Sequence, residues 1–562
     1  MATMNFSGRT AYSETKVPFV SSPDLMNTVT LNAPVEADLH GGFRRFVGIC
    51  VAVAAMKLAI GIVGNILAQR AGYGIFRDEM YYLICGRHLA FGYVDQPPMV
   101  ALQARLTGIL FGYDHMWSLR LLSGMAGAVK VFLTGALVWA MGGNRRAAAL
   151  GMLGVTVAGV YLGIDSYLSM NSFEPVFWIP CALALIRIVQ AETLPDSEKV
   201  VRNWWIVLGV SAGLGLENKD NEVFFLVAVL IALLLTPQRR ILASRWFGVA
   251  VAIMVALALP NLLWQIHNHW PTLEWLIGVS KSNKDTKLPP LQFLAGQGMM
   301  LNPFTAPLWI SGVLWLLFAK AARRVLFLGV LYPVYLLMMM ALHAKDYYLA
   351  PIYVIYFAAG AICWFGWARD RVWRNALPAV YAALLVFAFI RSVPFSIPVL
   401  PPQQFIAYEK KIGFTPKDSE NHDATILPQF YADRFGWKEM VEKVARIYNS
   451  LPPQERAITG IYTGNYGEAS AINLFGPKYG LPVAISGHQT YWLWGPHGYS
   501  GQEMIIINGA KLADMKAYYD SCVVADRMDN PLSMPWEKNL ISLCHGRKGT
   551  YEADWKNFKY YY

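Results

Sequence analysis

Long apolar runs fill most of the first 394 residues of this 562-residue chain, and they constrain its fold more than any other feature. The first run, residues 46–68, is long enough to span a bilayer, which takes roughly 20 helical residues. Charged residues make up 15% of the chain, whereas a soluble protein carries about 25%. We therefore expect an α-helical polytopic membrane protein with about 11 transmembrane helices. The ten further predicted spans are 118–142, 147–164, 172–190, 204–216, 222–236, 243–266, 300–319, 325–342, 347–366 and 376–394.

The positions of Lys and Arg indicate how these spans are oriented. Residues 395–562 hold 17 basic and 17 acidic side chains, so the whole formal surplus of +11 lies in residues 1–394. Short cytoplasmic loops favour Lys and Arg. With a cytoplasmic N-terminus, the inner loops carry thirteen of them: Arg145, Arg146, Lys199, Arg202, Arg239, Arg240, Arg245, Lys320, Arg323, Arg324, Arg369, Arg371 and Arg374.

This orientation divides the chain into three regions. Residues 1–45 form a cytoplasmic segment without the pattern of a cleaved signal peptide. Residues 46–394 form the transmembrane region, with a large outer loop at 69–117, and residues 395–562 form an extracytoplasmic domain. We expect the inner (plasma) membrane, with the C-terminal domain in the periplasm or outside the cell. Basic charge confined to loops argues against a nucleic-acid partner.

The C-terminal region has a different pattern from the spans. The Pro-rich residues 394–402 predict a linker. A helical pattern at 433–450 precedes short apolar runs at 457–462, 481–486 and 504–508, which are separated by Gly-rich turns. This order predicts a small α/β or α+β domain. Cys522 and Cys544 fall in it, and the spacing fits a disulfide or two free buried thiols equally well.

Ionisable side chains gather at the predicted outer ends of the spans. The outer loop holds Arg77-Asp78-Glu79, and its apolar spacing suggests a short helix lying along the membrane interface. Asp95 follows before a Pro-Pro pair. A carboxylate paired with its neighbour Arg77 is the simplest explanation of Asp78. The further outer positions, however, favour a functional site: they are Asp165, Glu174, Lys219 and Lys345.

Four segments resemble the motifs of a known enzyme family. Residues 78–82 (DEMYY) and 89–98 (LAFGYVDQPP) resemble the first outer loop of the protein O-mannosyltransferase-like glycosyltransferases. These GT-C membrane enzymes include the RgtA/B/C/D-like bacterial enzymes and the lipid A aminoarabinose transferase. Residues 213–219 (GLGLENK) resemble the family's Gly-rich turn that ends in Lys, and 345–351 (KDYYLAP) its Lys-Tyr-Pro motif.

The resemblance covers roughly residues 45–365 and implies an inverting glycosyltransferase. Such an enzyme moves a sugar from a polyprenyl-phosphate-linked donor to an acceptor hydroxyl at the outer face of the membrane. By motif match, Asp78 is the catalytic base and Glu79 its supporting acid. A carboxylate takes the acceptor's proton while cations stabilise the leaving phosphate.

The same resemblance implies a substrate-binding set around these two acids. Asp95 falls where the family has a second acid, and Glu174 falls near a third. Some relatives have Lys after the second acid, but this chain has Gln96, so other cations become the candidates for the phosphate. The predicted substrate-binding residues are Asp95, Arg77, Tyr82, Glu174, Lys219, Lys345 and Tyr347.

Several alternatives stay open at this level. No cofactor is expected, and a divalent metal is compatible with the class but is indicated by no ligand motif. The acceptor is a glycan, a lipid or a protein, with membrane lipid as a further partner. Gly- and aromatic-rich residues 463–468 and 487–496 fit acceptor binding or ordinary packing. His267–Trp270, with Lys281, Lys284 and Lys287, fits an interfacial anchor better than a sugar contact.

Two other functions compete with the enzyme. The first is a transporter or flippase of a lipid-linked sugar, although transporters usually show inverted repeats and broken helices at the middle of the membrane. The second is an outer binding module on a membrane anchor, for which eleven spans are excessive.

Overall fold

The computed structural model describes residues 33–192, 194–282, 287–368, 373, 375–413, 425–508, 515 and 517–562. Residues 1–48 and 49–562 are two compact units, and only the second is described further. Most of the predicted cytoplasmic segment lies outside the described residues, as do Lys284, Arg369, Arg371 and Arg374. The predicted boundaries at 45 and 394 stay predictions.

A multi-pass membrane chain is confirmed, with fewer full-length spans than expected. Among the described residues, seven helices are long and apolar enough to cross a membrane, or nine if two sharply bent pairs each count as one span. The bent pairs are Asn221–Leu234 with Pro237–Ala243 and Pro290–Met300 with Pro303–Phe318. The seven are Gly42–Arg70, Leu121–Ala140, Met170–Ala191, Arg245–His267, Lys320–Ala341, Asp346–Trp367 and Ala376–Ser396.

Two of the eleven predicted spans account for the difference between eleven and nine. Residues 147–164 are broken at Ala158, whose extended backbone separates α6 (Arg145–Val157) from α7 (Gly159–Ile164). Residues 204–216 lie in the 21-residue helix α9 (Glu198–Asn218), which begins with a charged turn. Both segments are helical, but neither is a continuous run of the required length and apolarity.

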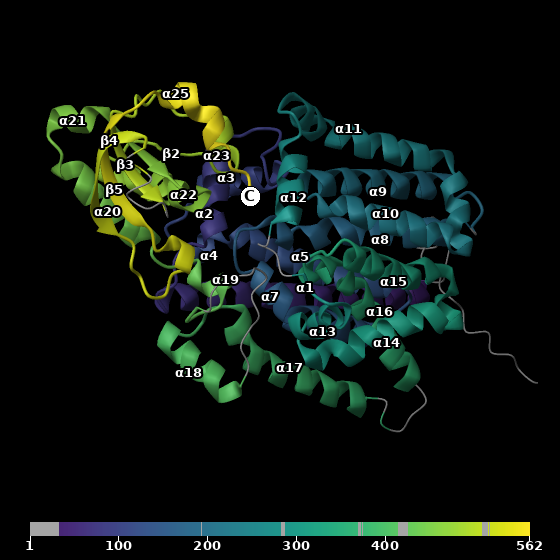
Figure 1. Cartoon of the computed structure of the whole chain (residues 1–562). Coiled ribbons are helices and arrows are strands. Elements are labelled where there is room, and N and C mark those ends of the chain that lie inside the picture. The colour runs from purple at the N-terminus through teal and green to yellow at the C-terminus, as the bar shows by residue number, and fades with distance from the viewer. Residues whose placement is uncertain are drawn as a thin grey trace, which may run out of the picture. The chain divides into compact units, whose positions relative to one another are not determined.

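Small residues let the long helices pack closely. A Cβ atom at Gly312 of α14 (Ala306–Phe318) would collide with the Tyr356 carbonyl of α16 (Tyr353–Ala368), and a Cβ at Gly360 would collide with the Leu308 carbonyl. Gly209 of α9 meets Ala250 in the same way. Helix backbones in membranes approach through such small residues. Figure 1 shows the resulting row of α8 (Glu174–Ala191), α9, α10 (Asn221–Leu234) and α11 (Arg245–His267).

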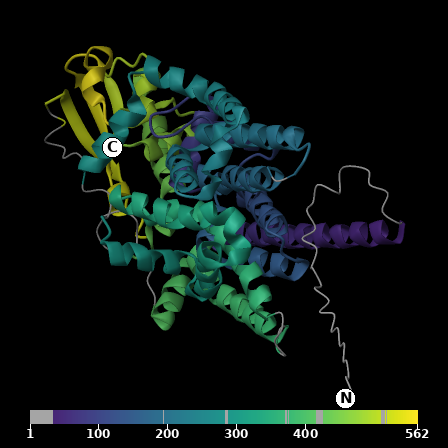
Figure 2. The ribbon, with the colours of Figure 1, turned by 90° about the vertical axis from the view of Figure 1, so that its right-hand side faces the viewer.

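The C-terminal region contains a small sheet, as predicted. Five strands are arranged in the order β2-β1-β3-β5-β4. Figure 2 shows the yellow strands of this region from the side. β1 pairs parallel to β2 and β3, whereas β5 pairs antiparallel to β3 and β4. The three predicted apolar runs overlap β1, β2 and β3, while β4 and β5 were not predicted. The bounds are β1 Thr459–Thr463, β2 Ala484–Ser486, β3 Glu503–Asn508, β4 Tyr519–Arg527 and β5 Leu540–Arg547.

The predicted helix at 433–450 corresponds to α20 (Trp437–Ser450). The predicted linker is shorter than 394–402, because α17 (Ala376–Ser396) ends and α18 (Pro402–Ile412) begins inside that range. The remaining α-helices among the described residues of this region are α19 (Gln429–Ala432), α21 (Pro453–Ile458), α22 (Tyr466–Phe475), α23 (Thr490–Trp494) and α25 (Tyr551–Asp554).

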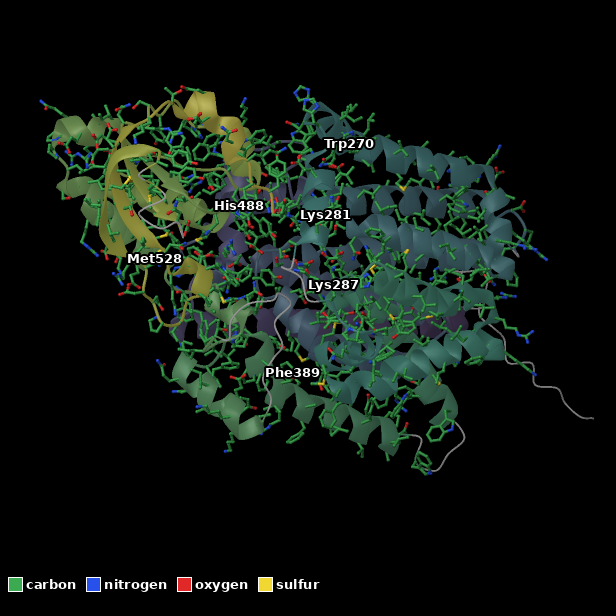
Figure 3. The ribbon with its side chains drawn as sticks, viewed as in Figure 1. Trp270, Lys281, Lys287, Phe389, His488 and Met528 are labelled. Carbon is green, nitrogen blue, oxygen red and sulfur yellow. A yellow bond between two sulfur atoms is a disulfide. The ribbon has the colours of Figure 1, made fainter. Side chains whose placement is uncertain are left out.

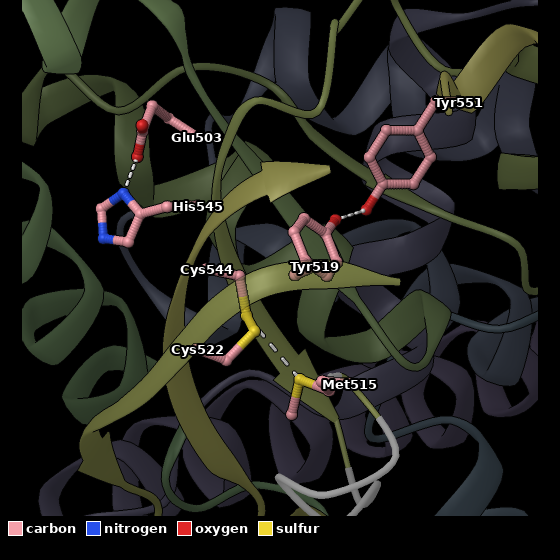
Figure 4. Close-up of a disulfide and its surroundings, with 7 residues drawn as sticks. All are labelled: Glu503, Met515, Tyr519, Cys522, Cys544, His545 and Tyr551. Carbon is pink, nitrogen blue, oxygen red and sulfur yellow. Dashed lines mark hydrogen bonds and ion pairs between the residues drawn. A yellow bond between two sulfur atoms is a disulfide. The ribbon is translucent and has the colours of Figure 1, made fainter. Parts of the chain in front are cut away.

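A disulfide joins the two cysteines of the sheet. Cys522 on β4 and Cys544 on β5 are directly opposite each other in the ladder, and their sulfur atoms are bonded (Figure 4). The alternative of two free thiols is therefore excluded. Met515 packs against the bridge, with its sulfur 3.9 Å from that of Cys544. All six cysteines are described, and the other four are free.

The sheet region and residues 69–117 share one hydrophobic core. Met80 and Leu83 of α2 (Arg77–Arg87) and Val100 of α3 (Met99–Leu110) are buried in the same cluster as Val441 of α20 and Ile472 of α22. The predicted short helix at this place is confirmed. Its position along the membrane interface is not favoured, because nine of its eleven residues are buried by protein.

Candidate functional site

The first turn of α2 carries Asp78 and Glu79. Carboxylates are stabilised near a helix N-terminus, where the backbone N–H groups have no partner within the helix. Successive residues of a helix point about 100° apart, so these two acids face different surroundings. Their contacts assign them different tasks.

Glu79 is fully buried and saturated with hydrogen bonds. Arg120 donates to both of its oxygens at 2.8 Å, from Nε and Nη2. The backbone N–H groups of Leu168 and Phe76 donate at 2.7 and 2.9 Å. Burial alone would raise the pKa of Glu79, but the charge and hydrogen bonds of Arg120 lower it below its usual value. A carboxylate has about four acceptor sites, so these contacts favour a positioning role for Glu79.

Asp78 is half-buried and meets a residue of the sheet region. The Tyr466 phenol, at the start of α22, donates a hydrogen bond of 2.7 Å to Asp78 Oδ1. Burial raises the pKa of Tyr466 well above its usual value, and Arg77 offsets only part of that rise. The phenol therefore stays protonated and remains a donor to the carboxylate.

Asp95 has a similar partner. Tyr81 Oη lies 3.0 Å from Asp95 Oδ1 and 2.7 Å from Thr490 Oγ1, and Val94 donates its N–H to Thr490. A phenol has one proton to donate. The consistent arrangement is a relay in which Thr490 donates to Tyr81 and Tyr81 donates to Asp95.

These residues form one group, which we name the acid cluster. The rings of Tyr81 and Tyr466 are 4.8 Å apart. Burial is the largest cause of the raised pKa of Tyr82, and the negative charges of Asp78 and Asp95 raise this pKa further. Both acids therefore lie close enough to act on the Tyr82 phenol. The acid cluster consists of Asp78, Asp95, Tyr81, Tyr82 and Tyr466.

Arg77 is held by residues of the sheet region. Its guanidinium lies 4.5 Å from the centre of the Tyr466 ring, and Nε is 3.8 Å from Glu537 of the sheet region. The side chain is buried. These contacts favour a role in holding α2 against the sheet region, and the predicted phosphate contact stays a prediction.

A second group, the lysine cluster, surrounds Lys219 at the end of α9. Lys219 Nζ lies 3.1 Å from Glu174 and 2.8 Å from the Asn171 amide oxygen. Its ammonium group also lies over the rings of Tyr348 and Tyr347, at 4.5 and 5.4 Å. Both tyrosines belong to the short helix η6 (Asp346–Ile352), directly after Lys345. The lysine cluster consists of Asn171, Glu174, Lys219, Asn221, Tyr347 and Tyr348.

The turn before α8 connects the two clusters. Asn171, which holds Lys219, also donates to the Tyr167 phenol at 3.4 Å. Burial raises the pKa of Tyr167, and the charge of Asp78 raises it further. The structure thus brings the predicted residues Asp78, Asp95 and Tyr82 together, and separately Glu174, Lys219 and Tyr347, with Tyr167 between the groups.

Other acids and aromatic residues singled out in the sequence lie elsewhere. Asp165 forms a buried ion-pair group with Lys57 and Lys130, at 3.0 and 2.8 Å. Figure 3 shows Trp270 and Lys281, which begin and end the stretch around α12 (Pro271–Lys281). Trp270 is 45% exposed, as an interfacial anchor would be. Within the described part of the chain, no three His, Cys, Asp or Glu side chains are grouped to hold a metal ion.

Sequence reasoning missed seven residues of the site: Tyr81, Tyr167, Asn171, Asn221, Tyr348, Tyr466 and Thr490. Tyr466 and Thr490 lie in the two Gly- and aromatic-rich segments for which acceptor binding and ordinary packing were both left open. Their composition marked them as unusual, but it did not indicate that they contact α2.

The helical region joined to a small sheet is a GT-C-type fold. Two crystal structures of ArnT from Cupriavidus metallidurans, one bound to undecaprenyl phosphate and one in the apo state, match it with a TM-score of 0.55. Each covers 88% of this chain and 98% of ArnT, at 13% and 12% sequence identity. At this identity, the match establishes the fold.

Sequence comparisons confirm the expected resemblance. The model of the dolichyl-phosphate-mannose-protein mannosyltransferase family matches residues 95–264, a segment that includes Asp95, Glu174 and Lys219. The lipid A galacturonosyltransferase RgtD of Rhizobium johnstonii is 29% identical over 244 residues, which are 42% of this chain. The chain spans about half (48%) of the length of this curated relative.

Proposed function

We propose that this protein is an inverting glycosyltransferase that uses a polyprenyl-phosphate-linked sugar donor. The observation that carries the proposal is the link between the two clusters: Lys219 donates to Asn171, Asn171 donates to the Tyr167 phenol, and the charge of Asp78 raises the pKa of that phenol. The acid cluster provides a base, and the lysine cluster provides a cation.

The chemistry follows from these two groups. The acceptor oxygen attacks the anomeric carbon from the side opposite the phosphate, so the configuration inverts. The bond from that carbon to the phosphate oxygen breaks, and the acceptor's proton passes to Asp78. The polyprenyl phosphate leaves with its negative charge stabilised by Lys219, with Lys345 and Arg77 as further candidate contacts.

The remaining residues are assigned by their place in the clusters. Asp95 and Tyr82 belong to the acid cluster with Asp78, so we assign them to the sugar or the acceptor hydroxyl. Glu174 fixes Lys219, and Tyr347 covers it, so both act on the phosphate through the lysine. Glu79 holds the helix that carries the base.

The disulfide supports an extracytoplasmic sheet region, because disulfides persist in oxidising compartments. We infer an inner-membrane protein with a cytoplasmic N-terminus and both clusters at the outer face. The similarity to ArnT, solved with undecaprenyl phosphate, supports that lipid as donor carrier. The similarity to RgtD makes lipid A the first acceptor to test and galacturonic acid the first sugar.

The test uses full-length protein in lipid vesicles with a radiolabelled galacturonosyl undecaprenyl-phosphate donor and a lipid A acceptor. We expect labelled acceptor whose anomeric configuration is inverted relative to the donor. A transporter, the competing function, would move the labelled donor across the bilayer and form no labelled acceptor. That result, or a product of retained configuration, would contradict the proposal.

A further inference from the structure

One hydrogen bond connects the proposed base with the sheet region. The Tyr466 phenol donates to Asp78 Oδ1 at 2.7 Å, although the two residues are 388 positions apart in the sequence. Asp78 belongs to the helix after the first predicted span, whereas Tyr466 begins α22 beneath the sheet. The contact thus makes a residue of the C-terminal region a neighbour of the reacting groups.

The backbone around Tyr466 is held in place on both sides. The Asn465 side chain caps α22 by accepting from the Glu468 N–H at 3.0 Å. The N–H of Gly464 donates to the Ile507 carbonyl of β3 at 2.7 Å, which ties the start of the helix to the sheet. The backbone that carries the Tyr466 phenol is therefore attached to the sheet and to the capped end of α22.

The ring of Tyr466 is fixed as well. The Arg77 guanidinium lies 4.5 Å from its centre, the Tyr81 ring 4.8 Å and the His488 ring 5.1 Å. Gly467 makes room for this arrangement, because a Cβ atom there would lie 2.8 Å from both Cγ and Nε of Arg77. A side chain at position 467 would push Arg77, and the ring beneath it, out of place.

We propose that Tyr466 is the positioning residue of Asp78: its phenol holds one carboxylate oxygen so that the other oxygen faces the acceptor hydroxyl. The inference rests on the proposed function, since it assigns Asp78 the role of base. The sheet region thereby becomes part of the active site and not only a neighbouring domain. A base must be held in reach of the proton that it takes.

A pH profile separates positioning from mere packing. The titratable groups whose interaction with Asp78 is described are Arg77 and Tyr82 on its own helix, Tyr167 on the turn before α8, and Tyr466. Asp95 acts on both Tyr82 and Tyr466, and His488 packs against the Tyr466 ring. A hydrogen bond to the charged form of a carboxylate favours that form. Without the Tyr466 hydroxyl, Asp78 takes up a proton at higher pH, so the acid limb of the rate profile moves upward.

The experiment compares Tyr466→Phe with a matched variant in full-length protein reconstituted in vesicles. Tyr479→Phe is the match, because the Tyr479 phenol also donates to a carboxylate of the same region, Glu442, at 3.0 Å. We expect Tyr466→Phe to lower kcat about tenfold or more with little change in the KM for the donor. We also expect the acid limb of kcat/KM to move up by about one pH unit. Tyr479→Phe should match the wild type in all three values.

Gly467→Ala provides a second variant if Tyr466→Phe does not fold. It should produce the same shift of the acid limb through the displaced Arg77 and Tyr466. A wild-type acid limb in the folded variants would overturn the proposal. Asp78→Asn is measured beside them: full turnover in Asp78→Asn refutes the proposed function itself, whereas its loss together with wild-type behaviour of the Tyr466 variants refutes only the present inference.

Discussion

Arg120 donates two hydrogen bonds of 2.8 Å to Glu79, one to each carboxylate oxygen, and both side chains are completely buried. The guanidinium also donates to Asn65 of α1 (Ala33–Arg70) at 2.9 Å. This ion pair ties α2 to the start of α5 (Leu121–Ala140). Glu79, next to the proposed base, thus fixes the position of the helix that carries Asp78.

Breaking this pair should destabilise the protein. Arg120→Met leaves the Glu79 charge buried without its partner, which costs about 3–5 kcal/mol in comparable pairs. Replacing both by Met should cost less than the sum of the single changes, because no buried charge remains. Thermal unfolding in detergent measures this double-mutant cycle, with the exposed Glu198→Gln as a control that leaves Tm unchanged. A Glu79→Gln variant with wild-type Tm and no transferase activity would instead indicate a catalytic role.

Lys219 should act on the donor phosphate. Lys219→Met removes the cation and should lower kcat/KM for the lipid-linked donor about 100-fold, as when a charge-stabilising group is lost. Because Glu174 then loses its cationic partner, Lys219→Arg serves as the matched variant that keeps the charge, and it should recover much of the rate. Lys281→Met, at an exposed helix end, should leave the rate unchanged. Equal losses in the Met and Arg variants would show that the charge of Lys219 is not what matters.

The disulfide makes a prediction about thiols and stability. In denatured protein without reductant, four cysteines should react with a maleimide, and after reduction six should react. Closing a loop of 22 residues should contribute about 3 kcal/mol to the stability of the sheet region. Cys522→Ser with Cys544→Ser should therefore lower Tm under oxidising conditions and make it insensitive to dithiothreitol. Six reactive thiols before reduction would contradict the structure.

The buried acids beneath Arg77 predict a pH dependence of stability. Burial raises the pKa of Glu468 well above its usual value, and the neighbouring Glu537 raises it further. A carboxyl group whose pKa is raised by folding contributes stability below its ordinary pKa of about 4.3, and that stability is lost as the pH rises through the folded value.

The Tm of the wild-type protein should therefore fall from pH 5 to pH 9. Glu468→Gln cannot ionise, so its Tm should fall less steeply over that range, whatever its absolute value. The exposed Glu552→Gln should keep the wild-type slope. If the Tm of the wild type and of Glu468→Gln fell equally steeply with pH, the raised pKa of Glu468 beside Glu537 would be refuted.

The sequence predicted the membrane-spanning helices well where the length of an apolar run alone identifies a span. Single long runs such as α5 and α11 match predicted spans, because a bilayer needs only length and apolarity. The division at Ala158 was missed, since an extended residue inside an apolar run leaves no mark in composition. β4 was missed because most of its side chains are exposed, so it lacks the apolar alternation that identifies a strand.

The site was predicted only in part, for a related reason. Asp78, Asp95 and Lys219 stand out because ionisable residues near spans are costly. Their partners do not: Arg120 is 41 positions from Glu79, and Tyr466 is 388 positions from Asp78. Such pairs arise from the way α2 packs into the core of the sheet region, and no local pattern encodes that contact.

In the proposed reaction, Asp78 takes the proton of the acceptor. The most direct measurement is the single-turnover rate of sugar transfer in vesicles for Asp78→Asn, with Asp114→Asn, an exposed acid of the same 69–117 segment, as the matched control. The account predicts a loss of at least 100-fold for Asp78→Asn with unchanged Tm, and a wild-type rate for Asp114→Asn. A folded Asp78→Asn protein that transfers sugar at the wild-type rate would contradict it.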